Sequence, residues 1–147
     1  MKKVLVFIKN NKNELLLLKG SAKDPMFHES FWYTITGGVE KEDASLIASV
    51  YREVKEETNL DIKNILYLNW IFEYECLGSW CEEYAYVATA KDTSNIVLNE
   101  ENIDYKWIDL ETFVDEIKWY SDKAELKAIL KAALSGVQYF KVEKREK

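Results

Sequence analysis

The segment GGVEKEDASLIASVYREVKEETNL, from Gly37 to Leu60, is the most informative part of this chain for predicting its structure. From Leu46 onward, apolar residues recur every fourth position, which is the spacing of a helix with one buried face. Asp43 precedes this run as a candidate helix N-cap, and the run continues through Thr58. Asn59 follows as a residue that tolerates the left-handed conformation in which helices often end. The spacing therefore predicts a helix that begins after Asp43 and ends at Asn59.

Three glutamates lie on one face of this predicted helix. At about 100° per residue, Glu53, Glu56 and Glu57 fall within a face roughly 100° wide, with Arg52 on its flank. Like charges at this spacing weaken a helix by a few tenths of a kcal/mol per pair. A hard divalent cation such as Mg²⁺ or Mn²⁺ would offset that repulsion, because these ions prefer oxygen ligands. The alternative is a solvated acidic face paired with Arg52 and Lys55, and this segment taken alone favours it.

A pair of glycines ends the extended aromatic stretch Phe31–Thr36. Gly37 and Gly38 are predicted to form a turn, since paired glycines relieve the restriction on φ. Such a turn leaves backbone groups open at the end of a strand, where a carbonyl can bind the same cation and amides can bind a phosphate. Together, the glycine turn and the carboxylate face favour a metal-assisted phosphate site.

The rest of the chain predicts an α+β domain. Alternating or continuous apolar runs predict strands, and a polar segment with the only proline, residues 21–30, predicts a loop. A second helix is predicted at residues 122–134, stopped by Gly136. The order of strands, helix, strands and helix fits a mixed sheet between helices in one domain, residues 1–147, with a core at about 3–134. The predicted strands are residues 3–8, 14–18, 31–36, 60–75, 82–90 and 103–108.

Bulk composition excludes several classes of protein. The 48% hydrophobic content argues against disorder, and the net charge of −6 argues against a broad basic surface for nucleic acid. The apolar run Val4–Ile8 is too short for a signal peptide or a membrane span. Cys76 and Cys81 are expected to be small, unpaired strand residues in a reducing cytosol, and His28 a surface residue of a loop. The exposed aromatics leave a monomer or a homodimer open.

The stretch quoted above resembles the Nudix box, whose pattern is G-x5-E-x7-R-E-U-x-E-E-x-G-U, where U is apolar. Two positions depart from this pattern. Asn59 replaces the final glycine, and the upstream acid is either Asp43, counted from Gly37 with one extra residue before Arg52, or is replaced by Ala44, counted from Gly38. We prefer the first count, because Asp43 then also serves as the N-cap. The matching positions are Arg52, Glu53, Val54, Glu56, Glu57 and Leu60.

The resemblance implies a Nudix-type α/β/α sandwich and the hydrolysis of a diphosphate linkage by water. Glu53, Glu56 and Glu57 would hold one to three Mg²⁺ ions, with Mn²⁺ as an alternative, and Arg52 would brace these carboxylates. A glutamate shortly before the segment Tyr105-Lys106-Trp107 is a further ligand or the general base in many family members. Glu101 matches it better than Glu100, and the base is therefore Glu53 or Glu101. The carbonyl ligand is that of Gly37 or Gly38.

The resemblance also implies a small, nucleotide-like substrate whose ring lies against side chains of the sheet and loops. A nucleoside triphosphate or related nucleoside diphosphate derivative ranks first, and dihydroneopterin triphosphate second. A non-catalytic ligand-binding domain is the remaining alternative. For each aromatic residue taken singly, packing in the core is the commoner role. The candidate substrate contacts are Phe31, Trp32, Trp70, Phe72, Trp80 and Lys19.

Overall fold

A mixed seven-stranded sheet forms the centre of the molecule in the computed structural model, which describes residues 1–21, 30–76 and 78–136. The main path of the sheet runs β3-β2-β1-β6-β5, while β4 pairs with β1 and β7 pairs with β2. The strands are β1 Lys2–Lys9, β2 Leu15–Gly20, β3 Trp32–Tyr33, β4 Ile35–Gly38, β5 Ile62–Cys76, β6 Ser79–Ala90 and β7 Asn102–Ile108. The helices are α1 Leu46–Thr58, α2 Leu110–Glu116 and α3 Lys123–Ser135, with a 3₁₀ turn, η1, at Thr93–Asn95.

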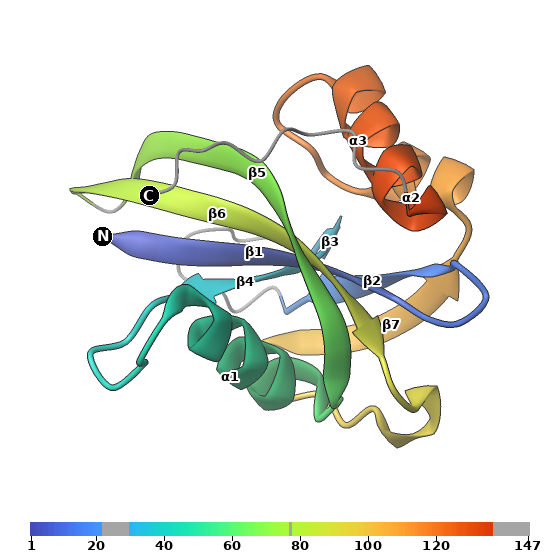
Figure 1. The fold of residues 1–147 in the computed structure, drawn as a ribbon, viewed down its shortest axis with the longest axis horizontal. Coiled ribbons are helices and arrows are strands. Elements are labelled where there is room, and N and C mark those ends of the chain that lie inside the picture. The colour runs from blue at the N-terminus through green and yellow to red at the C-terminus, as the bar shows by residue number, and fades with distance from the viewer. Residues whose placement is uncertain (22–29, 77, 137–147) are drawn as a thin grey trace.

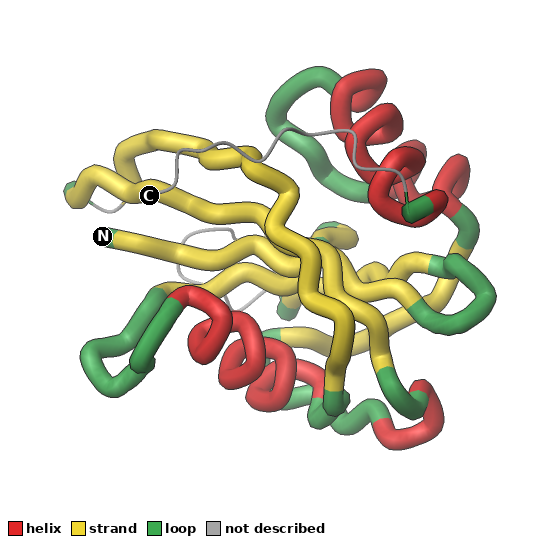
Figure 2. The backbone as a smooth tube through the Cα atoms, in the orientation of Figure 1, coloured by secondary structure: helices red, strands yellow, loops and turns green. Residues whose placement is uncertain are grey.

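Helices cover both faces of the sheet. Figure 1 and the tube in Figure 2 show α1 on one face and α2 with α3 on the other. Strand β1 supplies both cores, because successive side chains of a strand point to opposite faces. Leu5 and Phe7 pack on the α3 side, whereas Val4 and Val6 pack on the α1 side. The expected α+β sandwich is therefore confirmed.

Strands β2 and β4 pair with opposite ends of the same edge of β1. Antiparallel pairing of β1 with β2 is limited to Lys9 opposite Leu15, whereas β4 pairs with the other end of β1, from Lys3 opposite Gly38 to Val6 opposite Ile35. On its other edge β1 pairs in parallel with β6 along its whole length. Residues of β2, β4 and α1 therefore meet beside β1, where the candidate site lies.

The start of α1 differs from the prediction, whereas its end agrees. Ser45, not Asp43, is the N-cap, and its hydroxyl accepts a hydrogen bond from the amide of Ala48 at 3.1 Å. The Asp43 carboxylate is instead bound by the Arg52 guanidinium, so it is not available to cap the helix. Asn59 ends the helix in the left-handed conformation, with φ of 66°, as the sequence predicted.

The predicted turn at Gly37-Gly38 is wrong. Both glycines continue β4, where Gly37 lies opposite Val4 and Gly38 opposite Lys3, and neither has a positive φ. The chain turns later, where the amide of Asp43 donates to the carbonyl of Glu40 at 2.9 Å. The reason for glycine at position 37 is space above the strand, as described below.

The remaining predictions of secondary structure are largely confirmed. All the predicted strands exist, although the aromatic stretch 31–36 is divided between β3 and β4. The last helix has Asp122 as its N-cap and Gly136, with φ of 78°, as its C-cap. The short elements α2 and η1 were not predicted. The predicted loop at 21–30, which includes His28, lies almost entirely outside the described residues.

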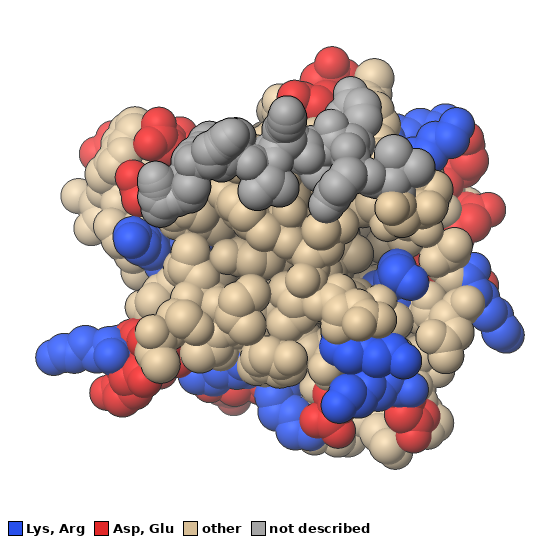
Figure 3. Space-filling view, viewed as in Figure 1, with Lys and Arg blue, Asp and Glu red and all other residues tan. Residues whose placement is uncertain are grey.

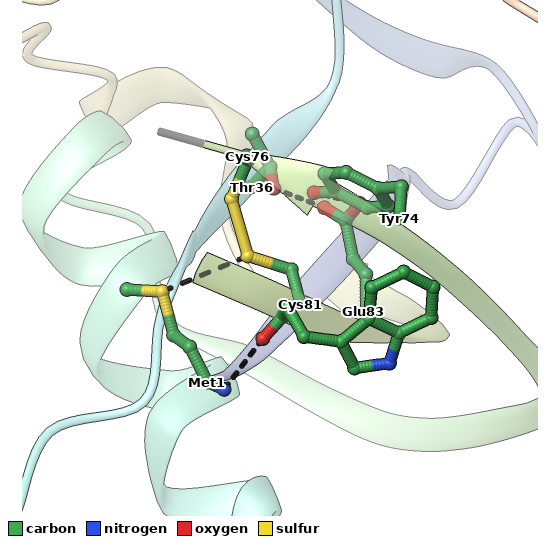
Figure 4. Close-up of a disulfide and its surroundings, with 7 residues drawn as sticks. Met1, Thr36, Tyr74, Cys76, Cys81 and Glu83 are labelled. Atoms are coloured by element: carbon green, nitrogen blue, oxygen red, sulfur yellow. Dashed lines mark hydrogen bonds between the residues drawn. A yellow bond between two sulfur atoms is a disulfide. The ribbon is translucent and has the colours of Figure 1, made fainter. Parts of the chain in front are cut away.

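The two cysteines differ from the prediction of unpaired residues. Cys76 ends β5 and Cys81 lies early in β6, and the hairpin brings their Cα atoms to 6.4 Å, where the side chains form a disulfide. Figure 4 shows this disulfide beside Met1 and Glu83. Within the described residues no helix is both long and apolar enough to cross a bilayer.

Candidate active site

Arg52 forms hydrogen bonds with several of the acidic side chains around α1. Its guanidinium donates to both oxygens of Asp43, at 3.0 Å from Nε and 2.8 Å from Nη2. Nη2 also donates to the carbonyl of Gly38 at 2.8 Å, which ties the helix to β4. The hydrogen bonds from Arg52, followed by those from the Glu40 amide and the Ser49 hydroxyl, hold the pKa of Asp43 well below its usual range. Arg52 is thus placed to hold the helix and strand together.

The same guanidinium holds two of the three glutamates. Nη1 donates to Glu53 at 3.1 Å and to Glu56 at 3.3 Å. The side chain of Glu56 is 51% exposed, whereas Glu53 as a residue is only 8% exposed. Burial raises the pKa of Glu53, and the neighbouring Arg52 charge partly opposes that rise. Arg52 therefore binds both of these carboxylates.

Glu53 lies directly over Gly37. A Cβ atom at position 37 would lie 2.0 Å from the carboxylate carbon of Glu53, which no real contact permits. Gly37 is therefore required for the close approach of α1 to β4. The Gly38 carbonyl already accepts a hydrogen bond from Arg52, which leaves Gly37 as the better candidate for a carbonyl ligand.

Glu57 is the most deeply buried carboxylate of this face. It is 5% exposed, its Oε1 accepts a hydrogen bond from Asn102 at 3.3 Å, and its Oε2 has no partner. Burial raises the pKa of Glu57 well above its ordinary value, and the nearby charges of Glu101 and Glu53 raise it further. A buried carboxylate without a cation is costly. The structure therefore brings Glu53 and Glu101 near enough to Glu57 for their charges to act on it.

These residues have the chemistry of a magnesium site but are not arranged as one. Carboxylate oxygens are the ligands that Mg²⁺ and Mn²⁺ prefer, and Glu57 presents a buried oxygen that lacks a partner. Among the described residues, however, no three acidic, histidine or cysteine side chains stand ready to hold an ion. Glu53 and Glu56 each turn one carboxylate oxygen toward Arg52.

A cleft of about 550 Å³ begins at Glu57. Glu57, Glu101 and Asn102 line it together with Gly20 of β2. Aromatic residues make much of its wall, and two of them, Phe72 and Trp119, meet edge to face with ring centroids 5.6 Å apart. The aromatic residues that line it are Phe31, Tyr33, Phe72, Tyr74, Trp119 and Tyr120. Its size and lining suit a small ligand with a flat ring.

Of the six predicted substrate contacts, the structure brings Phe31 and Phe72 to the cleft. Trp70 packs instead against Phe72 and Trp119 at the edge of the α3-side core. Trp32 lies under the ammonium group of Lys106, 4.4 Å from the ring centroid, and also under that of Lys19, at 5.7 Å. Trp80 is 58% exposed on the β5–β6 hairpin. None of Trp32, Trp70, Trp80 and Lys19 lines the cleft.

Several lining residues were not foreseen from the sequence. Asn102, which donates to Glu57, follows the predicted Glu101 directly but was not among the predicted site residues. Glu83 lies in a strand where Cys81, Ala85 and Val87 are buried, and the alternation of that strand places Glu83 on the same inward face. A carboxylate on an inward face was therefore a signal available in the sequence.

Comparison with known proteins supports one family. The family model for the NUDIX domain matches residues 1–129. Two curated relatives, each an NAD-capped RNA hydrolase NudC, are 30% identical: one from Vibrio atlanticus over 115 residues and one from Mannheimia succiniciproducens over 108. The matches cover 76% and 71% of this chain but only 38% of each relative.

Solved structures share the fold at lower sequence identity. The NUDIX domain of Shewanella oneidensis NrtR, complexed with ADP ribose, has a TM-score of 0.70 at 18% identity and covers 91% of this chain and 88% of its own. The E. coli dihydroneopterin triphosphate pyrophosphohydrolase has a TM-score of 0.68 at 19% identity, over 92% of this chain and 96% of its own. At such identities the likeness establishes the fold alone.

Proposed function

Because the chain belongs to the NUDIX domain family, we propose that it is a magnesium-dependent hydrolase of a diphosphate linkage in a nucleoside triphosphate or a related nucleoside diphosphate derivative. One observation carries the proposal. The unpaired, buried oxygen of Glu57 lies near the charges of Glu53 and Glu101, at a cleft with aromatic walls. A cation held there would relieve the mutual repulsion of the carboxylates and attract a diphosphate into the cleft.

The carboxylates of this site share one role in the proposed reaction. Glu53, Glu56, Glu57 and Glu101 would hold the ion, with the Gly37 carbonyl as a further ligand. When bound, the ion supplies positive charge that neutralises the diphosphate and lowers the pKa of water.

Arg52 acts through the carboxylates and not on the substrate. It does not line the cleft, and it fixes Glu53 by a charge-assisted hydrogen bond of 3.1 Å. Glu53 or Glu101 takes the proton from the attacking water. The Glu53 carboxylate lies over Gly37, and Glu101 lines the cleft.

Two alternatives differ in substrate or in catalysis. Dihydroneopterin triphosphate is the second candidate substrate, because an aromatic cleft of this size suits flat bicyclic rings in general. A non-catalytic ligand-binding domain is the other alternative, since the similar NrtR domain is complexed with ADP ribose. The complete set of Glu53, Glu56 and Glu57 favours catalysis.

Substituting the buried glutamate separates these possibilities. We expect Glu57→Gln to abolish the magnesium-dependent release of phosphate or pyrophosphate from a panel of nucleotides. Folding should remain intact, because glutamine has the same shape and is neutral, and burial already favours the neutral form of Glu57. The matched control is Glu125→Gln, which removes an exposed helical carboxylate of α3 and should leave turnover unchanged.

Ion binding is measured separately from turnover. Mn²⁺ titration followed by electron paramagnetic resonance should show a bound ion that Glu57→Gln weakens and Glu125→Gln does not. If Glu57→Gln unfolds the domain, or if the wild-type chain binds no ion at millimolar concentration, the carboxylate face is structural and the proposal fails.

A further inference from the structure

A second buried carboxylate lines the cleft, on a different strand from the candidate ion ligands. Glu83 lies in β6 and is 6% exposed. Its Oε1 accepts a hydrogen bond from the hydroxyl of Tyr74 at 2.9 Å, and its Oε2 accepts one from the hydroxyl of Thr36. Figure 4 shows both hydroxyl groups meeting this carboxylate. In the sheet, β1 and β2 separate Glu83 from Asn102 of β7, which binds Glu57.

Glu83 has no ion pair among the described residues. Burial, and then the negative charge of Glu83, raise the pKa values of Tyr33, Tyr74 and Tyr120. These phenols therefore stay protonated around the carboxylate. Because burying a carboxylate without a cationic partner is costly to a fold, the position of Glu83 in a cleft wall indicates a role in ligand binding.

The two hydroxyl groups leave part of the carboxylate available. An ionised carboxylate has about four lone-pair sites. Thr36 and Tyr74 use one site on each oxygen, which leaves one acceptor on each. Two parallel acceptors match a ligand with two adjacent N–H donors. Guanine and pterin present such a pair, a ring N–H beside an amino group, whereas adenine presents an amino group beside a ring acceptor.

The neighbouring strand adds a complementary charge. Lys3 of β1 is the register partner of Glu83 and lines the same cleft. In guanine and pterin, a carbonyl oxygen follows the ring N–H along the same edge, and the side chain of Lys3, which also lines the cleft, can supply a donor to that oxygen. Phe72 and Trp119, also in the cleft wall, offer faces for the flat ring.

We propose that Glu83 makes the cleft selective for substrates whose ring carries an amino group, an adjacent ring N–H and a carbonyl oxygen, the edge shared by guanine and pterin. This inference rests on the proposed function and specifies the substrate class. Glu83 accepts both N–H donors, and Lys3 serves the carbonyl. The diphosphate then extends toward Glu57 and Glu101.

A matched set of triphosphates tests the selectivity. The set is GTP, ITP, ATP and dihydroneopterin triphosphate, because ITP differs from GTP only in lacking the amino group. We expect kcat/KM for GTP or dihydroneopterin triphosphate to exceed that for ITP by about 10-fold and that for ATP by about 100-fold, since one and then two charge-assisted hydrogen bonds are lost. Whichever of GTP and dihydroneopterin triphosphate has the higher kcat/KM shows whether the natural ring is a guanine or a pterin.

Glu83→Gln removes the paired acceptors while keeping the size of the side chain. We expect it to lower kcat/KM for GTP by about 10- to 100-fold and to remove the preference for GTP over ITP, with little effect on ATP. Glu75→Gln is the matched control, because Glu75 is exposed on β5 of the same hairpin and does not line the cleft.

Binding without turnover separates this inference from the proposed function. With magnesium removed, tryptophan fluorescence should report tighter binding of GMP and neopterin than of IMP and AMP, and Glu83→Gln should abolish that order. If no triphosphate is hydrolysed yet this order holds, the ring selectivity stands and the hydrolase proposal fails. Hydrolysis with equal kcat/KM for GTP, ITP and ATP, or a preference that survives in a folded Glu83→Gln variant, overturns the inference alone.

Discussion

Replacing Gly37 with alanine tests the geometry of the carboxylate face most directly. A Cβ atom at position 37 would lie 2.0 Å from Cδ of Glu53 and 2.2 Å from both carboxylate oxygens. Ordinary contact begins at 3.4 Å, so the carboxylate must retreat by about 1.4 Å, the difference between 3.4 and 2.0 Å. Glu53 is 8% exposed and bound by Arg52, so the movement also disturbs the guanidinium and the packing of α1 on β4.

The expected losses follow from that displacement. Overpacking costs about 1–3 kcal/mol, and the stiffer unfolded chain of an alanine variant recovers about 0.4–1 kcal/mol. We therefore expect the free energy of unfolding to fall by about 1–2 kcal/mol. Misplacing a group of the catalytic constellation by about 1 Å costs about 100-fold in rate, so kcat/KM should fall by about that factor.

Gly38→Ala is the matched control for this prediction. Its Cβ would meet only the terminal methyl group of Met1, at 3.4 Å, and φ at position 38 is not positive. Stability should change by less than about 1 kcal/mol, and activity should be retained. Urea unfolding measures the first quantity, and magnesium-dependent turnover of the best nucleotide measures the second.

A double variant assigns the effect to the right pair of residues. In a Glu53→Ala background the clash has no partner, so Gly37→Ala should no longer destabilise the fold, a coupling of about 1–2 kcal/mol. If Gly37→Ala is as active as the unaltered chain, or if Gly38→Ala is equally damaging, the account of Glu53 held over Gly37 is refuted.

Two further predictions concern Arg52 beside the carboxylates and Tyr86 in the core. Arg52→Lys keeps the charge but loses the two-pronged pairing with Asp43, so we expect a lower melting temperature and a loss of at least about tenfold in kcat/KM; an unchanged rate would contradict the bracing role. Burial, and then Tyr67 and Tyr84, raise the pKa of Tyr86 to about 12 from its ordinary 10.0. Stability from its neutral form is therefore complete below pH 10 and lost as the pH rises toward 12, and Tyr86→Phe should flatten that loss in urea unfolding between these values.

The acidic face of α1 was predictable because helical periodicity alone decides which side chains share a face. Glu53, Glu56 and Glu57 needed no knowledge of the rest of the fold, and neither did the C-cap at Asn59. The N-cap was not predictable in the same way. Asp43 and Ser45 both belong to the residue types that favour an N-cap. The choice between them depends on Arg52, nine residues beyond Asp43, which forms hydrogen bonds with the Asp43 carboxylate.

Gly37 shows why local reasoning gave the wrong role to a correctly chosen residue. Paired glycines usually signal a turn, but here they lie in a strand with ordinary backbone angles. The need for glycine comes from the carboxylate of Glu53, which α1 places over β4, and that contact exists only after the helix has packed on the sheet. The short helix α2 was missed because seven residues show too little periodicity to separate a helix from a loop.

The carboxylates of the cleft determine how the affinity for a ligand depends on magnesium. The chain has a net charge of −6, and the space-filling view in Figure 3 shows acidic side chains beside the basic ones around an uncharged centre on that face. Glu57 of α1 and Glu101, next to β7, line the cleft, and Glu83 of β6 lines it as well, so a bare triphosphate would meet like charge near each of them. Under our proposals the ring supplies donors to Glu83, and the cation supplies the positive charge between the phosphates and Glu57. Affinity for the triphosphate should therefore depend strongly on magnesium, whereas affinity for the ring alone should not.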